Sequence, residues 1–448
     1  MTPYAAKAAQ LATDVARARR DGTVAVGLAK STSNLFRERA ARVAPRVNLS
    51  HFDSVVDVDT VAGCIDAEGM TTYAHLVDAA LAAGAMPAVV PQLKSITLGG
   101  AVAGVGIEAT SFRQGLVHDT ISAMDVLTGD GRILTCTPEN EHRDLFRALP
   151  NSYGTLGYAI KLTARTLPVR PCVRVEHAKY ADATSFFAAL AAQCSDPSAD
   201  FVDGVAFGRD ELVLSTARFV DDAPFTSDYT YERIYYRSLR ERDIDYLTTR
   251  DYLWRWDTDW FWCSRNVGAE QPLLRRLYGR RRLNSVTYQK IMRWNTRWRV
   301  TSTFDRMRGM HTESVIQDVD IPLARAREFL DFLHAGVGIL PIWICPIRAP
   351  DPAHPATLYP LPQATLSVNF GFWDTVKSRT RRAPGAVNRS IEQRVRALGG
   401  VKSLYSDSYF TEDEFWTIYA RAAYLDVKAR YDPANVLGDL YAKCVLRR

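Results

Sequence analysis

Residues 96–115 read ITLGGAVAGVGIEATSFRQG and contain five of the chain's 26 glycines. Within this stretch, Gly104, Gly106 and Ala109 satisfy the pattern G-x-G-x-x-A, which is typical of the phosphate-binding turn of Rossmann domains. Two other interpretations are open. The glycines can form a loop that brings main-chain N–H groups against an anionic ligand, or they can form a simple bend in a sheet.

The sequence after the glycines disfavours the Rossmann interpretation. A Rossmann fold needs a full helix after the glycine turn and an acidic residue at the end of the next strand. Asp125 and Asp130 are candidates for that acid, but residues 110–119 lack the apolar spacing of a helix and Gly115 interrupts them. A parallel crossover does not fit into so short a connection. We therefore expect a glycine loop without a helix.

The flanking sequence predicts an α+β fold. Apolar residues recur at helical spacing over 71–87, and the N-terminal residues predict an amphipathic helix that ends at Gly22. Residues 118–139 predict a hairpin that turns at a Gly-Asp-Gly sequence, and residues 154–169 predict a strand preceded by glycines. Strands with interspersed helices indicate an α+β domain that extends to about residue 172.

Length and composition restrict the class of protein. A chain of 448 residues suits two domains, and a net charge of +6 is too small to indicate a nucleic-acid partner. The seven cysteines are scattered without a C-x-x-C motif, so we expect a reducing compartment and no metal site. No uninterrupted apolar run reaches the length of a membrane span. We expect a cytoplasmic protein that can contact the inner face of the cell membrane peripherally.

Four segments resemble a known family when they are taken together. Pro91, residues 97–115, residues 129–139 and residues 144–162 resemble, in this order, the PCMH-type FAD-binding domain of the vanillyl-alcohol-oxidase superfamily. The resemblance implies that the first glycines lie on the pyrophosphate and isoalloxazine of FAD, and that residues 154–157 lie by its adenosine half. It assigns to FAD the residues Thr97, Gly99, Gly100, Gly104, Gly106, Ser111, Gly115, Gly154, Gly157 and Ile160.

The chain departs from the family at its first pyrophosphate loop. The family pattern resembles R-G-x-G-x-S, whereas residues 30–37 here read KSTSNLFR and lack the glycines. Lys30 and Ser31 can still hold phosphate oxygens, although an ordinary polar turn is the other interpretation. The histidine that many members attach to the flavin is also absent, so we expect non-covalent FAD.

Further segments resemble one branch of this superfamily. Residues 315–323, 340–348 and 403–416 resemble the sterol Δ24-reductases, which reduce an isolated C=C bond in a lipid with NADPH through FAD. The chain lacks their membrane-anchoring N-terminal segment, and its Ala/Arg-rich composition is typical of a GC-rich bacterium. It thus resembles the flavin reductase that converts 10-methylene fatty acyl chains of phospholipids into 10-methyl chains of the tuberculostearic type. A partner methyltransferase would install the methylene group, and sterol Δ24-type reduction is the alternative.

The resemblance also implies a domain organisation. It predicts a two-part FAD-binding domain over residues 1–172 and a separate α/β cap that forms the substrate domain over 173–400. The remaining residues, 401–448, would return to the FAD-binding domain.

The expected chemistry needs a proton donor. An isolated alkene has no carbonyl group to accept a hydride, so a positioned acid has to protonate one carbon in a site that excludes water. The candidates are Glu108, His311, Asp318, Tyr405 and Asp407. For Glu108 the alternative is a carboxylate that accepts hydrogen bonds from the glycine loop. For His311 and Tyr405 the alternative is packing within the protein.

An aromatic and basic region lies in the middle of the chain. Residues 251–266 and 293–299 contain six of the nine tryptophans, and five arginines lie between them: Arg275, Arg276, Arg280, Arg281 and Arg282. Tryptophan combined with arginine indicates a surface for lipid headgroups, as a phospholipid substrate would require. A buried aromatic core with a solvated basic face is the other interpretation.

Two rival functions remain open. The wider superfamily contains oxidases and dehydrogenases of alcohols and sugars, which would need a polar pocket. A flavin-fold protein that binds lipid without catalysis is the second rival, and the missing glycines in residues 30–34 are its support.

Overall fold

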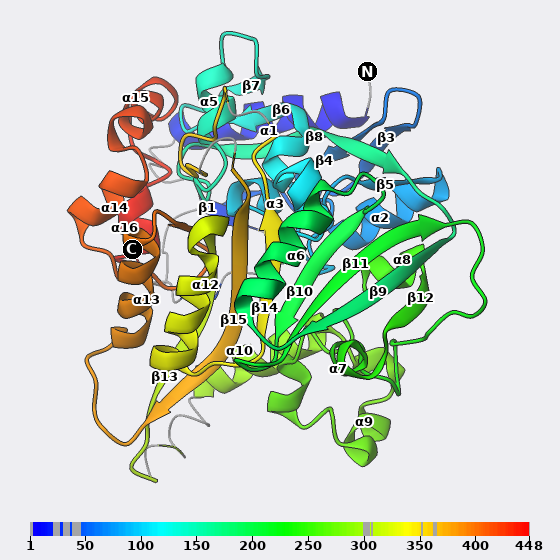
Figure 1. The fold of residues 1–448 in the computed structure, drawn as a ribbon. Coiled ribbons are helices and arrows are strands. Elements are labelled where there is room, and N and C mark those ends of the chain that lie inside the picture. The colour runs from blue at the N-terminus through cyan, green and yellow to red at the C-terminus, as the bar shows by residue number, and fades with distance from the viewer. Residues whose placement is uncertain are drawn as a thin grey trace.

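Two large β-sheets, of six and eight strands, with helices packed against them form most of the described molecule (Figure 1). The computed structural model describes residues 3–20, 27–29, 36–37, 46–298, 305, 308–350, 353–361 and 365–447. The first sheet is built from residues 55–168 and the second from residues 172–402. The predicted mixture of helices and strands is confirmed.

The first sheet is antiparallel throughout its named pairings. Its strands are β3 (Val55–Asp59), β4 (Cys64–Glu68), β5 (Ala85–Pro87), β6 (Ile121–Leu127), β7 (Ile133–Cys136) and β8 (Tyr158–Pro168). The predicted hairpin is β6–β7, and the predicted glycine-preceded strand is β8. The strands on either side of the glycine stretch, β5 and β6, both pair antiparallel with β8. A Rossmann crossover instead joins strands of a parallel sheet, so the stretch is not part of one.

The glycine stretch is a short helix, so the expectation of a loop is wrong for this part. Residues Leu98–Gly104 form α3, and the Thr97 hydroxyl accepts a hydrogen bond from the Gly100 N–H at 3.2 Å. The N–H groups of Leu98 and Gly99 donate to main-chain carbonyl groups of Thr71 and Gly69 at 2.9 Å. These tertiary bonds outweigh the low helix propensity of glycine.

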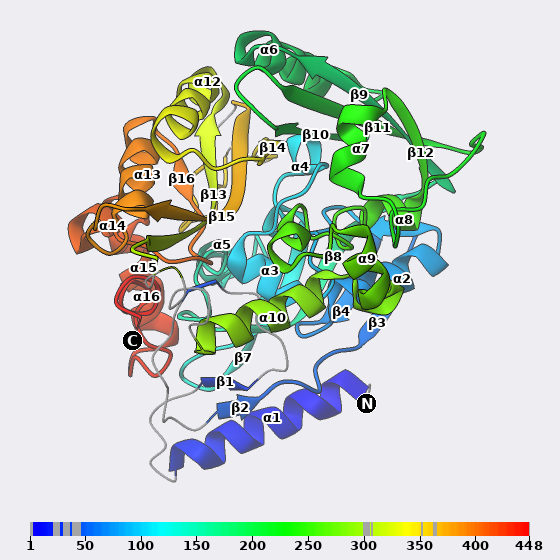
Figure 2. The same cartoon turned by 90° about the horizontal axis from the view of Figure 1, so that it is seen from below.

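Other helices surround the first sheet. Thr72 caps α2 by accepting a hydrogen bond from a main-chain N–H, as Thr97 does for α3. These helices are α1 (Pro3–Arg20), α2 (Tyr73–Ala82), α4 (Ser111–Gln114) and α5 (Arg143–Ala148). A short parallel pair, β1 (Gly27–Ala29) and β2 (Arg46–Asn48), lies near α1 in Figure 2.

The second sheet has the strand order β12-β9-β11-β10-β14-β15-β13-β16 and is also antiparallel. Its strands are β9 (Cys172–Tyr180), β10 (Phe201–Ala206), β11 (Leu212–Val220), β12 (Ile244–Thr248), β13 (His311–Pro322), β14 (Ile342–Ile347), β15 (Ser367–Ser378) and β16 (Val401–Lys402). Three helices cover one face of it: α6 (Ala183–Ser195), α12 (Leu323–Phe332) and α13 (Ala386–Ala397).

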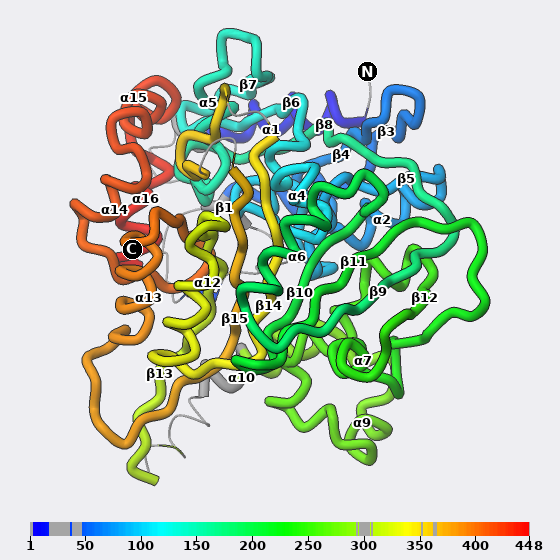
Figure 3. The backbone as a smooth tube through the Cα atoms, in the orientation of Figure 1, coloured from blue at the N-terminus to red at the C-terminus, as the bar shows by residue number. Residues whose placement is uncertain are grey.

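Within the described residues between β11 and β13 lie four more labelled α-helices, of which α9 and α10 lie toward the viewer in Figure 2. They are α7 (Tyr235–Glu241), α8 (Thr249–Leu253), α9 (Pro272–Tyr278) and α10 (Ser285–Trp298). Three helices follow at the C-terminal end, and the second of them, α15, packs against α5 (Figure 3). These are α14 (Glu412–Ile418), α15 (Arg421–Tyr431) and α16 (Leu440–Cys444).

One apolar core joins the two sheets. Leu162 of β8, Val173 of β9 and Trp343 of β14 belong to the same buried cluster as Tyr431 near the C-terminus. A second cluster lies between the second sheet and its covering helices. The two sheets therefore pack on each other, and this packing brings residues from distant parts of the chain to one cavity.

The contact between β4, β8 and α3 generates a first prediction. A Cβ atom on Gly69 would lie 1.9 Å from the main-chain oxygen of Ala159, so Gly69→Ala has to displace backbone. We expect the melting temperature to fall by roughly 10 °C, since clashes of this kind destabilise by several kcal/mol.

Gly208→Ala is the matched control, because the nearest atom to a Cβ there is 3.6 Å away. Its melting temperature should stay close to that of the unchanged protein. A Gly69→Ala variant with the same melting temperature as the control would show that the strand and helix separate freely at this contact.

Candidate functional site

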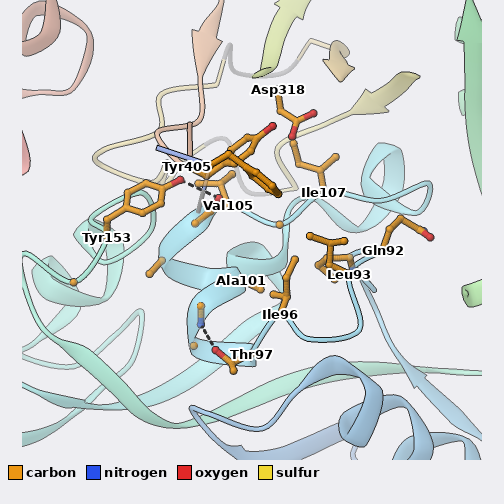
Figure 4. Close-up of a pocket in the computed structure, with 18 of the residues that line it drawn as sticks. Gln92, Leu93, Ile96, Thr97, Ala101, Val105, Ile107, Tyr153, Asp318 and Tyr405 are labelled. Atoms are coloured by element: carbon orange, nitrogen blue, oxygen red, sulfur yellow. Dashed lines mark hydrogen bonds between the residues drawn. The ribbon is translucent and has the colours of Figure 1, made fainter. Parts of the chain in front are cut away.

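A large cavity lies between α3 and the second sheet (Figure 4). It encloses about 1440 Å³ with its open mouth included. Helix α3 runs along one wall, from Thr97 at one end toward Asp318 and Tyr405 at the other.

The structure brings most of the predicted FAD residues to this wall. The predicted residues that line the cavity are Thr97, Gly99, Gly100, Gly104, Gly106, Gly154 and Gly157. Three others lie elsewhere: Ser111 accepts a hydrogen bond from the Glu108 N–H, Gly115 packs against Asp119, and Ile160 is fully buried in a separate apolar cluster. Lys30 and Ser31 lie outside the described residues.

The glycines of α3 serve two different purposes. A Cβ on Gly99 would lie 3.0 Å from the main-chain oxygens of Ala159 and Gly69, so this glycine lets the helix approach the sheet. The N–H groups at the start of α3 already donate within the protein, so this position gives no support to a main-chain phosphate contact there. A Cβ atom on Gly104 would lie 3.8 Å from its nearest side-chain neighbours, which belong to Tyr153, a residue that lines the cavity itself. Gly104 therefore leaves space that a ligand can fill.

The opposite wall is aromatic. Trp260, Phe261, Trp343 and Trp373 line it, and the ring centroid of Phe261 lies 4.6 Å from that of Trp373. Trp260 and Phe261 have φ angles of 42° and 60°, which are strained for residues with side chains. Such strain persists where the surrounding structure enforces it and is common at functional sites. The wall is suited to contact a planar or apolar ligand.

A hydrogen-bonded chain of three side chains faces the cavity. The Trp373 indole N–H donates to the Tyr405 hydroxyl at 3.2 Å, and Tyr405 bonds in turn to the carboxyl group of Asp318. Among the described residues that line the cavity, Asp318 alone has a carboxyl group. Burial raises the pKa of Asp318 to about 7, Tyr405 opposes this shift, and the nearby Asp320 adds to it. Asp318 can therefore carry a proton near neutral pH, as a general acid must.

Glu108 lies behind the cavity wall instead of facing the cavity. Its carboxylate pairs with Arg255 at 2.9 Å and also accepts a hydrogen bond from Gln92, which lines the cavity. Arg255 pairs equally with Asp203, and all three charged side chains are buried. Burial raises the pKa of Glu108, whereas Arg255 lowers it. This placement favours a structural role and gives no support to Glu108 as the proton donor.

His311 and Asp407 lie in a second, polar depression. His311 is exposed and is seven residues from Asp318 along β13, which is roughly 23 Å in an extended strand. Asp407 pairs with Arg447 at 3.3 Å. The structure therefore brings Tyr405 to the cavity and leaves the other two candidates outside it.

Arg37 is a residue that the sequence reasoning missed. It is buried, its guanidinium lies 4.7 Å from the ring centroid of Tyr153, and its Nε and Nη2 atoms have no partner among the described residues. Its Nη1 atom already donates to the main-chain oxygen of Leu404 and to the Cys444 Sγ atom. The two remaining nitrogens, buried beside the cavity, fit an anionic part of FAD. The signal was available, because Arg37 ends the stretch at which the family's pyrophosphate loop was sought.

Comparison with known proteins supports the same conclusion. Residues 3–137 match the family described as FAD binding domain. The Delta(24)-sterol reductase of Homo sapiens is 24% identical over 404 residues, which cover 87% of this chain and 75% of that protein. The homolog dhcr-24 of Caenorhabditis elegans is 25% identical over 443 residues, covering 91% and 80% of the two chains.

The chain contains an FAD-binding domain and is similar to sterol Δ24-reductases over most of its length, which indicates an FAD-dependent oxidoreductase. The predicted FAD-binding domain is thereby confirmed. A cytokinin dehydrogenase of Oryza sativa is 28% identical over 126 residues, which are only 28% of this chain. The similarity to sterol reductases therefore extends much further along the chain than the similarity to this dehydrogenase. None of the helices within the described ranges combines the length and the apolar character that crossing a bilayer requires.

The space at Gly104 generates a prediction about the cofactor. Gly104→Leu should weaken FAD binding at least tenfold, because the new side chain would occupy space that the protein leaves open. The stability of the cofactor-free protein should not fall, since glycine is the weaker helix former.

FAD fluorescence titration and thermal unfolding measure the two effects separately. Gly104→Ala should give an intermediate loss of affinity. Unchanged FAD affinity in the leucine variant would place the cofactor away from this end of α3.

The raised pKa of Asp318 generates a second prediction. Its folded-state pKa of about 7 exceeds its ordinary value of 3.8, so Asp318 favours folding most below pH 4 and loses this contribution as the pH rises through 7. Between pH 5 and pH 8 the melting temperature should therefore fall more in the unchanged protein than in Asp318→Asn. Equal falls in both proteins would show that Asp318 titrates as an ordinary surface carboxylate.

Proposed function

We propose that this protein reduces an isolated C=C bond in a lipid, with FAD as cofactor and NADPH as electron donor. The observation that carries the proposal is a protonatable carboxyl group, Asp318, opposite a glycine-containing wall in a cavity with aromatic sides. The relatives named Delta(24)-sterol reductases support it, because the similarity covers both sheets and includes the strand that carries Asp318.

The protein's own residues would divide the work as follows. FAD, once bound and reduced by NADPH, would supply the hydride for one alkene carbon. Asp318 holds a proton on its carboxyl group and delivers it to the other carbon, while Tyr405 and Trp373 fix the direction of that group. The aromatic wall excludes water, which would otherwise compete for the developing cation. Arg37 and the space at Gly104 would accommodate the cofactor.

The second sheet would serve as the substrate domain. It supplies Asp318, Trp343 and Trp373 to the cavity, and the C-terminal segment supplies Tyr405. These contributions support the proposed division into residues 1–172, 173–400 and 401–448. The cavity lining has few polar side chains among the described residues, which disfavours an alcohol or sugar as substrate.

The substrate itself is the finer part of the proposal. The named relatives favour a branched alkene of the sterol Δ24 type. The 10-methylene acyl chain of a phospholipid has the same need for a proton and a hydride, but no named relative supports it. A partner methyltransferase and the use of NADPH instead of NADH likewise remain proposals.

An anaerobic experiment separates these substrates. The FAD-loaded protein is reduced with NADPH and then mixed with a Δ24 sterol or with a phospholipid that carries a 10-methylene chain. Reoxidation of the flavin together with the saturated product identifies the substrate. If neither lipid reoxidises the reduced flavin, and an alcohol reduces the flavin of a separate oxidised sample, the protein is an oxidase or dehydrogenase. A protein that cannot be loaded with FAD would favour the non-catalytic alternative.

The proton donor generates a kinetic prediction. Asp318→Asn should slow double-bond reduction by about 100-fold or more and leave flavin reduction by NADPH unchanged. In the unchanged protein the rate should fall as the pH rises above about 7, since the protonated donor is lost. Tyr405→Phe should move this fall to higher pH, because Tyr405 lowers the pKa of Asp318.

Asp407→Asn provides the control, since Asp407 lies in the polar depression outside the cavity. Its rate and pH profile should match those of the unchanged protein. A large loss in Asp407→Asn with little change in Asp318→Asn would reassign the donor to the depression.

A further inference from the structure

Helix α9 exposes three leucines. Leu273 and Leu277 are 72% and 70% exposed, and Leu274 is 42% exposed. Leu273 and Leu277 are four residues apart and therefore share one side of the helix. Single exposed apolar residues are ordinary, whereas a cluster on one short helix indicates a surface that binds a membrane or another protein.

The orientation of α9 is fixed by a buried ion pair. Arg275 is 4% exposed, and its guanidinium donates to both carboxylate oxygens of Asp259 at 2.7 and 3.1 Å. It also donates to the main-chain oxygen of Ala269 at 3.1 Å. Because Arg275 faces inward in this way, the leucines on either side of it are held toward solvent.

Positive charge surrounds these leucines. Residues 272–298 contain seven arginines and one lysine but no aspartate or glutamate. Arg276, Arg280, Arg281 and Arg282 are exposed, and Arg280 has a partner, the exposed Asp228, at 2.9 Å. On α10, Val286, Lys290 and Trp294 are exposed at intervals of four residues and so share one face.

The tryptophans predicted to form a lipid surface lie mostly elsewhere. Trp254, Trp256, Trp260 and Trp262 are buried in the core, because they pack around the cavity wall. Trp294 is 57% exposed, and the side chain of Trp298 is outside the described residues. The exposed apolar surface of this region is therefore carried mainly by the leucines of α9.

Helices α9 and α10 both pack on the segment that forms the aromatic wall of the cavity. Arg275 of α9 pairs with Asp259, and the Tyr288 hydroxyl of α10 donates to the main-chain oxygen of Thr258 at 2.7 Å. The adjacent residues Trp260 and Phe261 line the cavity. Both helices lie on the same side of the molecule in Figure 2.

We propose that α9, the arginine turn 280–282 and the exposed face of α10 form a docking surface for an anionic lipid bilayer. The leucines would enter the boundary between headgroups and acyl chains, and the arginines would contact lipid phosphates. A nucleic acid would use the arginines but gains little from exposed leucines, so the combination favours a membrane. This inference does not rest on the proposed reaction, although a bilayer would present a lipid substrate close to the cavity wall.

Vesicle sedimentation tests the surface with the full-length, FAD-loaded protein. The protein should sediment with phosphatidylcholine vesicles that contain phosphatidylglycerol and not with phosphatidylcholine alone. Arg280→Gln/Arg281→Gln/Arg282→Gln should lower the partition coefficient about 100-fold at low salt, from roughly fivefold for each basic residue. Leu273→Asn/Leu277→Asn should lower it by a similar factor, about tenfold for each leucine.

Matched controls use equally exposed residues elsewhere. Val61→Asn changes an apolar residue that is 99% exposed on the turn after β3, and Arg381→Gln/Arg382→Gln removes two exposed arginines between β15 and α13. Both controls should bind vesicles as the unchanged protein does. Flavin absorbance and melting temperature confirm that every variant is folded.

Three outcomes would overturn the proposal. The first is equal binding to both kinds of vesicle, or no binding at all. The second is displacement of the protein from vesicles by single-stranded RNA together with normal vesicle binding in the leucine variant, which would indicate a nucleic-acid surface. The third is a lower molar mass of the leucine variant than of the unchanged protein in light scattering, with vesicle binding the same in both. This result would indicate that the leucines contact a second copy of this chain.

Discussion

The close approach of α3 to the first sheet determines where the cavity lies. Gly69 and Gly99 have no side chains at the point where the helix meets β8, and the Gly99 N–H donates to the Gly69 carbonyl group at 2.9 Å. A side chain at either position would displace the helix from the strand. With α3 held there, its other end, at Gly104, faces residues of the second sheet across the cavity. The position of the cavity wall formed by α3 is therefore set by main-chain packing at Gly69 and Gly99.

Burial then gives each acidic residue near the cavity a different role. Glu108 and Asp203 share Arg255, so one cation partly offsets the charge of both carboxylates and fixes their positions. Among the described residues no cation shifts the pKa of Asp318, and its buried Oδ1 atom has no hydrogen-bond partner there. Its carboxyl group therefore favours the protonated form, which is the state that a proton donor requires. Burial raises the pKa of both Glu108 and Asp318. Arg255 opposes this shift at Glu108, which belongs to a structural network, whereas Asp318 is left as a potential proton donor.

The cavity depends on segments that are far apart in the sequence. The Phe36 N–H donates to the main-chain oxygen of Tyr405 at 3.0 Å, so residues near both ends of the chain meet at the site. Asp318 and Trp373 come from neighbouring strands of the second sheet, which are paired over their whole length. The shared apolar core between the sheets holds these contributions together. A shift of one sheet against the other would separate the proposed donor from the glycine wall.

The sequence by itself determined the features that depend on local spacing and turn chemistry. These include the β6–β7 hairpin, strand β8 and the exclusion of a parallel crossover. The FAD-binding domain followed from the resemblance of several segments to a known family. The sequence named Tyr405 and Asp318 among its candidates but gave no reason to prefer them to His311 or Asp407. Only the tertiary structure made that distinction, because the protonation of an acid depends on burial and on partners such as Trp373, which lies 55 residues from Asp318 in the chain. The tertiary structure also placed the tryptophans inside and the α9 leucines outside, since hydrophobic composition alone does not fix which face of a segment is buried.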